Sequence, residues 1–165
     1  QVWLHIEACR ALWAFVARQD QVGRVVWPNA PADDPAWELF AEPRMLNAQD
    51  KEGVYFRIVD VAGALGERGY SADGEIVIGV GPDRESPWNQ GNWRLSVADG
   101  EGTVRATTDP ADVQFSIKSL SSAFSGFRRV SALAAWGLAA GEADAIARAD
   151  ALFATPHAPH SPDHF

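Results

Sequence analysis

Alternating apolar and polar residues in the middle of the chain constrain its fold most strongly. Apolar residues at every second position mark three runs: Ile76, Ile78 and Val80; Trp93, Leu95 and Val97; and Val113, Phe115 and Ile117. Such alternation is typical of strands with one buried face. Asp73-Gly74 and Asp99-Gly100 supply turn signals, and the second leads into a further short run around Val104. The pattern predicts an antiparallel sheet of about five strands.

Helix-forming residues replace this alternation from Ser119 onward. Their apolar positions follow steps of three and four through Leu120, Phe124 and Phe127, and the pattern resumes at Val130 after a break near Gly126. The segment 142–153 is alanine-rich, with an apolar inward face. An antiparallel sheet needs one face covered, and these helices can cover it. The sequence therefore predicts an α+β fold.

A strand and a short helix are expected just before the sheet. Val54 to Val59 is rich in β-forming residues, and Asp60 is well suited to cap a helix over Val61 to Arg68. Gly69 is the expected left-handed stop of that helix.

The first part of the chain follows a different pattern. Apolar residues at helical spacing predict an amphipathic helix, and they are Val2, Ile6, Cys9, Trp13 and Val16. No initiator methionine, N-cap or capping box precedes them, which favours a helix cut from a longer chain. Arg24 to Trp27 is a predicted strand, and prolines then interrupt regular structure. We place a domain boundary near residue 48, between a first domain over 1–48 and a second over 49–165.

Composition narrows the function classes. The formal net charge is -8, which disfavours a nucleic-acid partner and suits cationic ones, although acidity also serves solubility alone. No apolar run approaches the roughly 20 residues of a membrane helix. A single cysteine, Cys9, excludes an internal disulfide and lies on the apolar stripe, where an inert buried thiol is expected. We expect a cytoplasmic protein without a membrane span.

Standard catalytic motifs are missing, and the tail draws attention instead. No phosphate-binding loop, dinucleotide fingerprint or complete nucleophile elbow occurs. The last residues, 155–165, carry a proline at every third position, which favours an extended course. One hypothesis is a metal site, whose ligands would be His157, His160, Asp163 and His164. The simpler alternative is a rigid tail that docks in a groove, because such a tail loses little entropy on ordering.

Several short motifs resemble the C-terminal domain of enhanced-intracellular-survival (Eis) type acetyltransferases. They are Phe56-Arg57-Ile58-Val59-Asp60-Val61 with Ala64-Leu65, then Arg68 and Tyr70; Pro87-Trp88-Asn89-Gln90-Gly91 before Trp93 and Leu95; and Ala149-Asp150-Ala151-Leu152-Phe153 before the tail. Such proteins are similar to two fused GNAT modules followed by a sterol-carrier-like domain. The resemblance implies that residues 1–48 are the helix and strand that end the second GNAT module.

The resemblance also implies a function. The full-length protein is expected to be an acetyl-CoA-dependent N-acetyltransferase that acts on amines and assembles as a homo-oligomer. Its acetyl-CoA site belongs to the first GNAT module, so this chain alone is expected to be inactive and not to bind acetyl-CoA. The family's C-terminal carboxylate acts as a base, which gives that role to Phe165 and a substrate-lining role to His164. In water a carboxylate with a pKa of about 3.5 is a poor base, so burial and position must account for its effect.

Two other readings stay open at this point. The sterol-carrier-like part could bind a lipid or other apolar ligand, lined by residues such as Phe115, Phe124 and Trp136, although such residues more often fill a core. It could also have a purely structural role in holding subunits together.

Overall fold

The computed structural model describes residues 5–51 and 53–161, which form two compact units. The first unit contains the described residues up to Gly53 together with His160 and Ser161. The second runs from Val54 to Pro159. The division falls a few residues after the predicted boundary near residue 48. The chain thus passes between the units twice, once before the sheet domain and once along its tail.

The second unit is built on a five-stranded sheet in the order β3-β2-β1-β4-β5. The strands are β1 (Gly74–Val80), β2 (Gly91–Ala98), β3 (Glu101–Thr107), β4 (Val113–Phe115) and β5 (Ala139–Gly141). In the β1–β2 ladder Ile76 lies opposite Leu95 and Ile78 opposite Trp93, so the apolar positions share one face. The predicted number of strands and the faces of the first two are confirmed. The sequence analysis missed β5, because three small residues carry no alternation.

One pairing departs from the predicted antiparallel arrangement. β1 and β4 are parallel, with Ile78 opposite Val113, whereas the other three ladders are antiparallel. After β3 the chain crosses to the free edge of β1, where Asp112 fixes the register. The Val77 amide donates to the Asp112 carboxylate at 2.7 Å, and the Asp112 amide donates to the Val77 carbonyl at 2.8 Å. Alternation identifies a buried face but not which strand becomes the neighbour.

The turn between β2 and β3 is the two-residue turn that the sequence predicted. Ala98 pairs with Glu101, and the two residues between them have left-handed backbones, with φ of 54° at Asp99 and 80° at Gly100. Positive φ at both central positions is the requirement of the turn that best matches strand twist.

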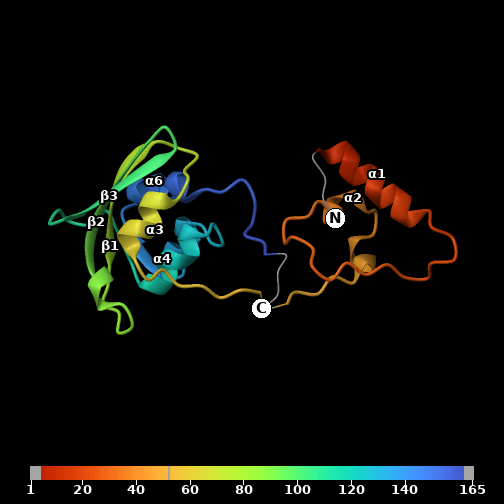
Figure 1. Ribbon diagram of the computed structural model, residues 1–165, viewed down its shortest axis with the longest axis horizontal. Helices are drawn as coiled ribbons and strands as arrows, with labels where there is room; N and C mark the ends of the chain where they lie inside the picture. The colour runs from red at the N-terminus through yellow and green to blue at the C-terminus, as the bar shows by residue number, and fades with distance from the viewer. Residues whose placement is uncertain (1–4, 52, 162–165) are drawn as a thin grey trace. The chain divides into compact units, whose positions relative to one another are not determined.

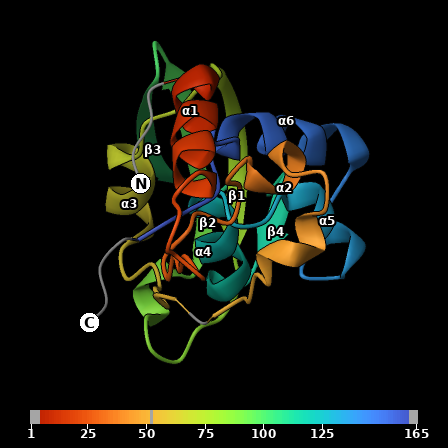
Figure 2. The ribbon, with the colours of Figure 1, turned by 90° about the vertical axis from the view of Figure 1, so that its right-hand side faces the viewer.

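Four helices cover one face of the sheet, as predicted (Figure 1). They are α3 (Val61–Glu67), α4 (Ile117–Phe124), α5 (Val130–Ala135) and α6 (Ala143–Phe153). Figure 2 shows this layer with α3 and α5 at opposite sides, and these helices contact β3 and β5 respectively. Fully buried side chains fill the core between the sheet and the helices, among them Leu65, Ile78 and Leu120. The outer face is polar, and there Arg94 pairs with Glu75 and Asp109.

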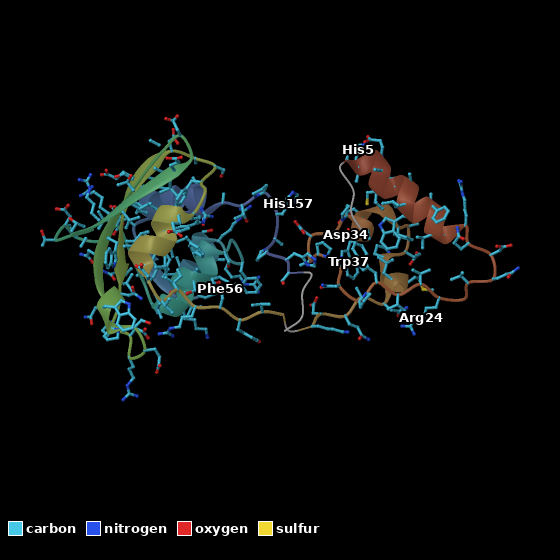
Figure 3. All side chains as sticks on the ribbon, viewed as in Figure 1. His5, Arg24, Asp34, Trp37, Phe56 and His157 are labelled. Atoms are coloured by element: carbon cyan, nitrogen blue, oxygen red, sulfur yellow. The ribbon has the colours of Figure 1, made fainter. Side chains whose placement is uncertain are left out.

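Two details before the sheet correct the sequence analysis. Val54 to Val59 forms no strand, because its backbone is held by the helical layer: the Ile58 amide donates to the Ser121 hydroxyl at 3.1 Å. Phe56 points toward α4, where its ring centroid lies 6.3 Å from that of Phe124 (Figure 3). The predicted cap is confirmed, since the Asp60 carboxylate accepts from the Gly63 amide.

The predicted stop of α3 is also corrected. The helix ends because Arg68 is extended, with φ -72° and ψ 137°, and Gly69 does not have a positive φ. Gly69 instead makes an isolated bridge to Glu101, which ties the end of α3 to the start of β3.

A short 3-10 turn, Pro87–Asn89, fixes the other end of α3. The buried Asn89 side chain accepts from the Val61 amide at 3.0 Å and donates to the Val59 carbonyl at 3.1 Å. The Trp88 indole donates to that same carbonyl at 2.7 Å. This turn thus satisfies the backbone at the start of the helix, which gives the Pro87-Trp88-Asn89 motif a structural role.

The first unit contains α1 (Ile6–Ala17), α2 (Ala36–Leu39) and the 3-10 turn η1 (Pro43–Leu46). The predicted helix is confirmed, but it has a cap that the sequence analysis missed: the His5 ring accepts from the Ala8 amide. Trp13 packs against Trp27 and Phe40, with ring centroids 5.9 and 5.3 Å away. The predicted strand over Arg24 to Trp27 does not form, because no described segment pairs with it.

Cys9 lies on the packed side of α1, as predicted. It is fully buried, and burial raises the pKa of its thiol, with the negative charge of Asp34 adding to the shift. A thiol held in its neutral form is a poor nucleophile, which fits a structural role.

Tyr70 makes the fold sensitive to high pH. Its hydroxyl donates to the Leu65 carbonyl at 2.7 Å, and burial raises its pKa to about 12, although the Arg68 charge acts the other way. The folded pKa lies above the usual value of about 10, so this contribution to stability is present below pH 10 and lost as pH rises toward 12. We expect the free energy of unfolding to fall by about 1 to 2 kcal/mol over that window, after allowance for solvent screening.

Urea unfolding at several pH values, followed in the wild type and in Tyr70→Phe, checks this prediction. The chain has two tyrosines, and the other, Tyr55, is 81% exposed. The difference in stability between the two proteins should therefore shrink as pH rises from 10 to 12. An unchanged difference across the window would contradict it.

Candidate functional site

The tail that follows α6 is the candidate site, because both predicted site residues belong to it. Phe165 and His164 lie outside the described residues, as does Asp163. The structure describes the tail from Ala154 to Ser161. His157, labelled in Figure 3, lies in the described part. What the structure shows is therefore how the tail leaves the domain.

Arg68 holds the point where the tail begins. Its guanidinium donates to the Leu152 carbonyl at 3.1 Å and to the Phe153 carbonyl at 2.9 Å, both at the end of α6. Its Nε donates to the Phe124 carbonyl at 3.0 Å, at the end of α4. The last carbonyls of a helix have no partner inside it. One side chain thus caps two helices that lie far from it in the sequence.

Two aromatic rings enclose this guanidinium. Its central carbon lies 4.8 Å from the ring centroid of Tyr70 and 5.4 Å from that of Phe153. Burial lowers the pKa of Arg68, but an arginine stays charged at any physiological pH. A positive charge at helix C-termini is also favoured by the helix dipole. The site is therefore a half-buried cation held by carbonyls and rings.

Gly126 gives the first residues of the tail their space. It follows α4 with φ of 74°, and a Cβ built there would lie 2.2 Å from the Thr155 hydroxyl oxygen. The Thr155 hydroxyl donates to the His157 carbonyl at 2.9 Å. A side chain at position 126 would therefore displace the tail where it leaves α6.

The far end of the described tail belongs to the first unit. There the Asn29 side-chain amide donates to the Ser161 carbonyl at 3.2 Å. Each end of the described tail thus has a contact within the unit to which it belongs, but residues 154–157 and 159–160 are exposed, so docking of the tail in a groove stays a prediction.

The metal hypothesis finds no support in the part that the structure describes. Within 5–51 and 53–161, no group of three His, Cys, Asp or Glu side chains is placed to hold a metal ion. Two of the four proposed ligands, Asp163 and His164, lie outside those ranges.

The pocket beside the tail does not support the alternative of an apolar-ligand site. A pocket of about 330 Å³ lies beside the start of the tail, and charged residues contribute to its wall, namely Arg128, Arg129 and Asp150. Two of the residues proposed to line an apolar cavity have other positions: Phe115 is buried in the core, and Trp136 is 58% exposed. Among the helices of residues 5–51 and 53–161, none has the length and apolar content of a membrane span.

Comparison with known families gives this arrangement a context. A family model described as a sterol carrier protein domain matches residues 61–162, which is most of the second unit with its tail. The chain belongs to the sterol carrier protein domain family. Residues 1–58 match a second model, described as an acetyltransferase (GNAT) domain. The order of a GNAT segment before a sterol carrier protein domain agrees with the resemblance drawn from the sequence.

Several relatives match the chain across both of these segments. The chain is 35% identical, over 94% of its length, to an uncharacterized N-acetyltransferase of Streptomyces coelicolor. Among solved structures, Eis1 from Mycobacterium abscessus matches 99% of the chain at 31% identity with a TM-score of 0.81. A GCN5-related N-acetyltransferase from Kribbella flavida matches 100% at 26% identity with a TM-score of 0.68.

The chain spans well under half the length of these proteins. It covers 38% of the Streptomyces coelicolor relative, 41% of the Eis1 chain and 43% of the Kribbella flavida chain. The region that matches this chain is thus one part of a longer protein in each of these relatives.

Sequence reasoning found the tail but missed what holds it. Arg68 was noted only as a motif residue, and Gly126 only as a helix break. A signal for Arg68 existed: a cation directly after a short helix, next to a buried tyrosine. Its partners at the ends of α4 and α6 lie 56 to 85 residues away, however, and no local pattern identifies them.

Proposed function

We propose that this chain is the C-terminal part of an acetyl-CoA-dependent N-acetyltransferase that acts on amines. The observation that carries the proposal is a GNAT segment joined to a sterol carrier protein domain, in a chain similar to N-acetyltransferases along nearly all its length. On this proposal the tail delivers the carboxylate of Phe165 to an active site in a GNAT module outside this chain. His164 lines the substrate there.

The task of the base in this reaction is to accept a proton from the amine. The amine nitrogen attacks the thioester carbonyl of acetyl-CoA, and the carbon–sulfur bond then breaks. Coenzyme A leaves as a thiolate and becomes the thiol by taking up the second proton that the nitrogen loses as the amide forms. The amine must lose a proton, because an ammonium has no lone pair to attack with. A positioned carboxylate can accept that proton, directly or through one water, and general-base assistance contributes about 10²- to 10⁴-fold.

Position is the main contribution of the tail to this chemistry. A carboxylate with an ordinary pKa of about 3.5 accepts a proton poorly in water, but burial raises its pKa. Its charge also attracts the cationic substrate. The excess of acidic residues in the chain, with a net charge of -8, favours a cationic substrate as well. A rigid tail that is held at its described ends suits a group that must reach a fixed point.

The remaining parts of the proposal concern the full-length protein. It binds acetyl-CoA through its GNAT modules and not through this chain, which alone is inactive. It works in the cytoplasm as a homo-oligomer.

Release of coenzyme A thiol from acetyl-CoA tests this function. The full-length protein should release thiol in the presence of a panel of primary amines and diamines, and residues 1–165 alone should not. The fall in thiol release when each amine is omitted is the control for simple thioester hydrolysis. Amine-independent release, or turnover by residues 1–165 alone, would overturn the proposal.

A further inference from the structure

We propose that Arg68 is a positioning residue for the catalytic tail, and that it acts by fixing the direction in which the chain leaves α6. This inference rests on the proposed function of the terminal carboxylate. Arg68 lies in the sheet domain and is not itself a catalytic group. It is the side chain that joins the ends of α4 and α6 through the carbonyls of Phe124, Leu152 and Phe153.

The geometry of these bonds requires a guanidinium. Nε serves α4, while Nη1 and Nη2 serve two consecutive carbonyls of α6, at 2.9 to 3.1 Å. Nη1 also donates to the Gly69 carbonyl at 3.1 Å. Gly69 in turn makes the isolated bridge to Glu101 at the start of β3. An ammonium group has a single nitrogen, so it cannot bind these carbonyls from three separate nitrogen atoms. Hydrogen bonds from a charged donor are also roughly twice as strong as neutral ones.

The bonded carbonyls are the last two before the tail. Phe153 is the final residue of α6, and Ala154 is already extended, with φ -58° and ψ 141°. Fixing the Leu152 and Phe153 peptide planes therefore fixes the first bond directions of the tail. Displacement of a reacting group by about 1 Å can cost about 10²-fold in rate. The contact at Arg68 thus bears on catalysis without approaching the substrate.

A second contact, between Gly126 and Thr155, also bears on the start of the tail. Gly126 follows α4, whose last carbonyl Arg68 also binds, and it lies against Thr155. Arg68 and Gly126 share no bond with each other in the described contacts, yet both act on the first residues of the tail. Gly126→Ala therefore moves the tail without removing the guanidinium.

The test uses Arg68→Gln in the full-length enzyme, with Arg105→Gln as the matched control. Arg105 is exposed on the outer face of β3, away from the tail. We expect Arg68→Gln to lower kcat by about 10- to 100-fold with the KM for acetyl-CoA unchanged, because only the placement of a reacting group is disturbed. Hydrogen exchange at residues 154–161 should become faster. Arg105→Gln should change neither quantity.

A double-variant cycle separates positioning from general destabilisation. One glycine appended after Phe165 displaces the carboxylate, so Arg68→Gln should cost little more in that background. An equal loss of kcat in both backgrounds would mean that Arg68 has only a structural role, which contradicts the proposal. Unchanged hydrogen exchange at residues 154–161 in Arg68→Gln would also overturn it.

Two possible results of these experiments call for a further variant or measurement. Where Arg68→Gln does not fold, Gly126→Ala carries the same measurements with the same expected results. Where the appended glycine leaves kcat intact, the proposed role of the carboxylate fails. Tail exchange then still shows whether Arg68 holds the tail, since that measurement does not depend on activity.

Discussion

Appending a single glycine after Phe165 of the full-length enzyme is expected to lower kcat by about 10²-fold or more, which is the contribution of a lost general base. The added residue turns the carboxylate of Phe165 into a neutral amide and moves the new carboxylate by one residue, about 3.3 to 3.6 Å along the chain. Neither the GNAT modules nor the packed core of the sheet domain is touched. The KM for acetyl-CoA should therefore stay unchanged.

A matched control inserts one glycine elsewhere in the same domain. The loop between β1 and β2 offers a place for it between Gly81 and Pro82, ahead of the turn in which the Ser86 amide donates to Asp83, and far along the chain from the tail. That variant should keep wild-type kcat, and an equal loss in both would point to misfolding as the cause. Undiminished turnover with the extended terminus would contradict the assignment.

Leu120→Ala is expected to destabilise the sheet domain by about 3 to 4 kcal/mol, in the usual range for a buried leucine cut to alanine. Leu120 is fully buried on α4, the helix whose end Arg68 binds. Its loss leaves a cavity between α4 and the sheet. For a domain of about 100 residues such a change lowers the thermal midpoint by roughly 10 °C or more.

Leu138→Ala is the control for this substitution, because Leu138 is 52% exposed. Its effect should stay within about 0.5 kcal/mol, as for most surface substitutions. Thermal unfolding of the 165-residue chain, followed by circular dichroism, measures both. Equal shifts for the two variants would mean that the core of the domain is not where the structure places it.

The elements with a strong local pattern could be predicted from the sequence. Alternation at Ile76, Ile78 and Val80 gave β1 and its buried face, and Asp99-Gly100 gave a turn whose backbone has the expected positive φ angles. The cap at Asp60 needs only its own residue and the amide of Gly63. Each of these depends on residues close together in the sequence.

Features that depend on distant partners could not be predicted. Val54 to Val59 has the composition of a strand, but Ser121 of α4 takes the place of a ladder partner. The parallel pairing of β1 with β4 depends on Asp112, which meets Val77 only after the chain has crossed the sheet. The role of Phe165 as a base was expected from the family resemblance, since no periodic pattern in the sequence indicates it.

The same distinction applies to the candidate site. The prolines identify a rigid tail, but its direction depends on Arg68, whose bonds to the end of α6 span more than 80 residues of sequence. Sequence reasoning thus identified the tail as the candidate segment and missed Arg68, which binds the last two carbonyls before it. The position of Phe165 itself stays a prediction.

The most direct measurement compares two semisynthetic forms of the full-length enzyme that differ only at the end of Phe165. One form ends in the natural carboxylate and the other in a carboxamide, which keeps the shape but removes the charge and the proton-accepting oxygen. The account predicts that the carboxamide form folds normally, keeps its KM for acetyl-CoA and loses about 10²-fold or more in kcat. Equal kcat for the two forms would contradict the claim that the backbone carboxylate is the functional group.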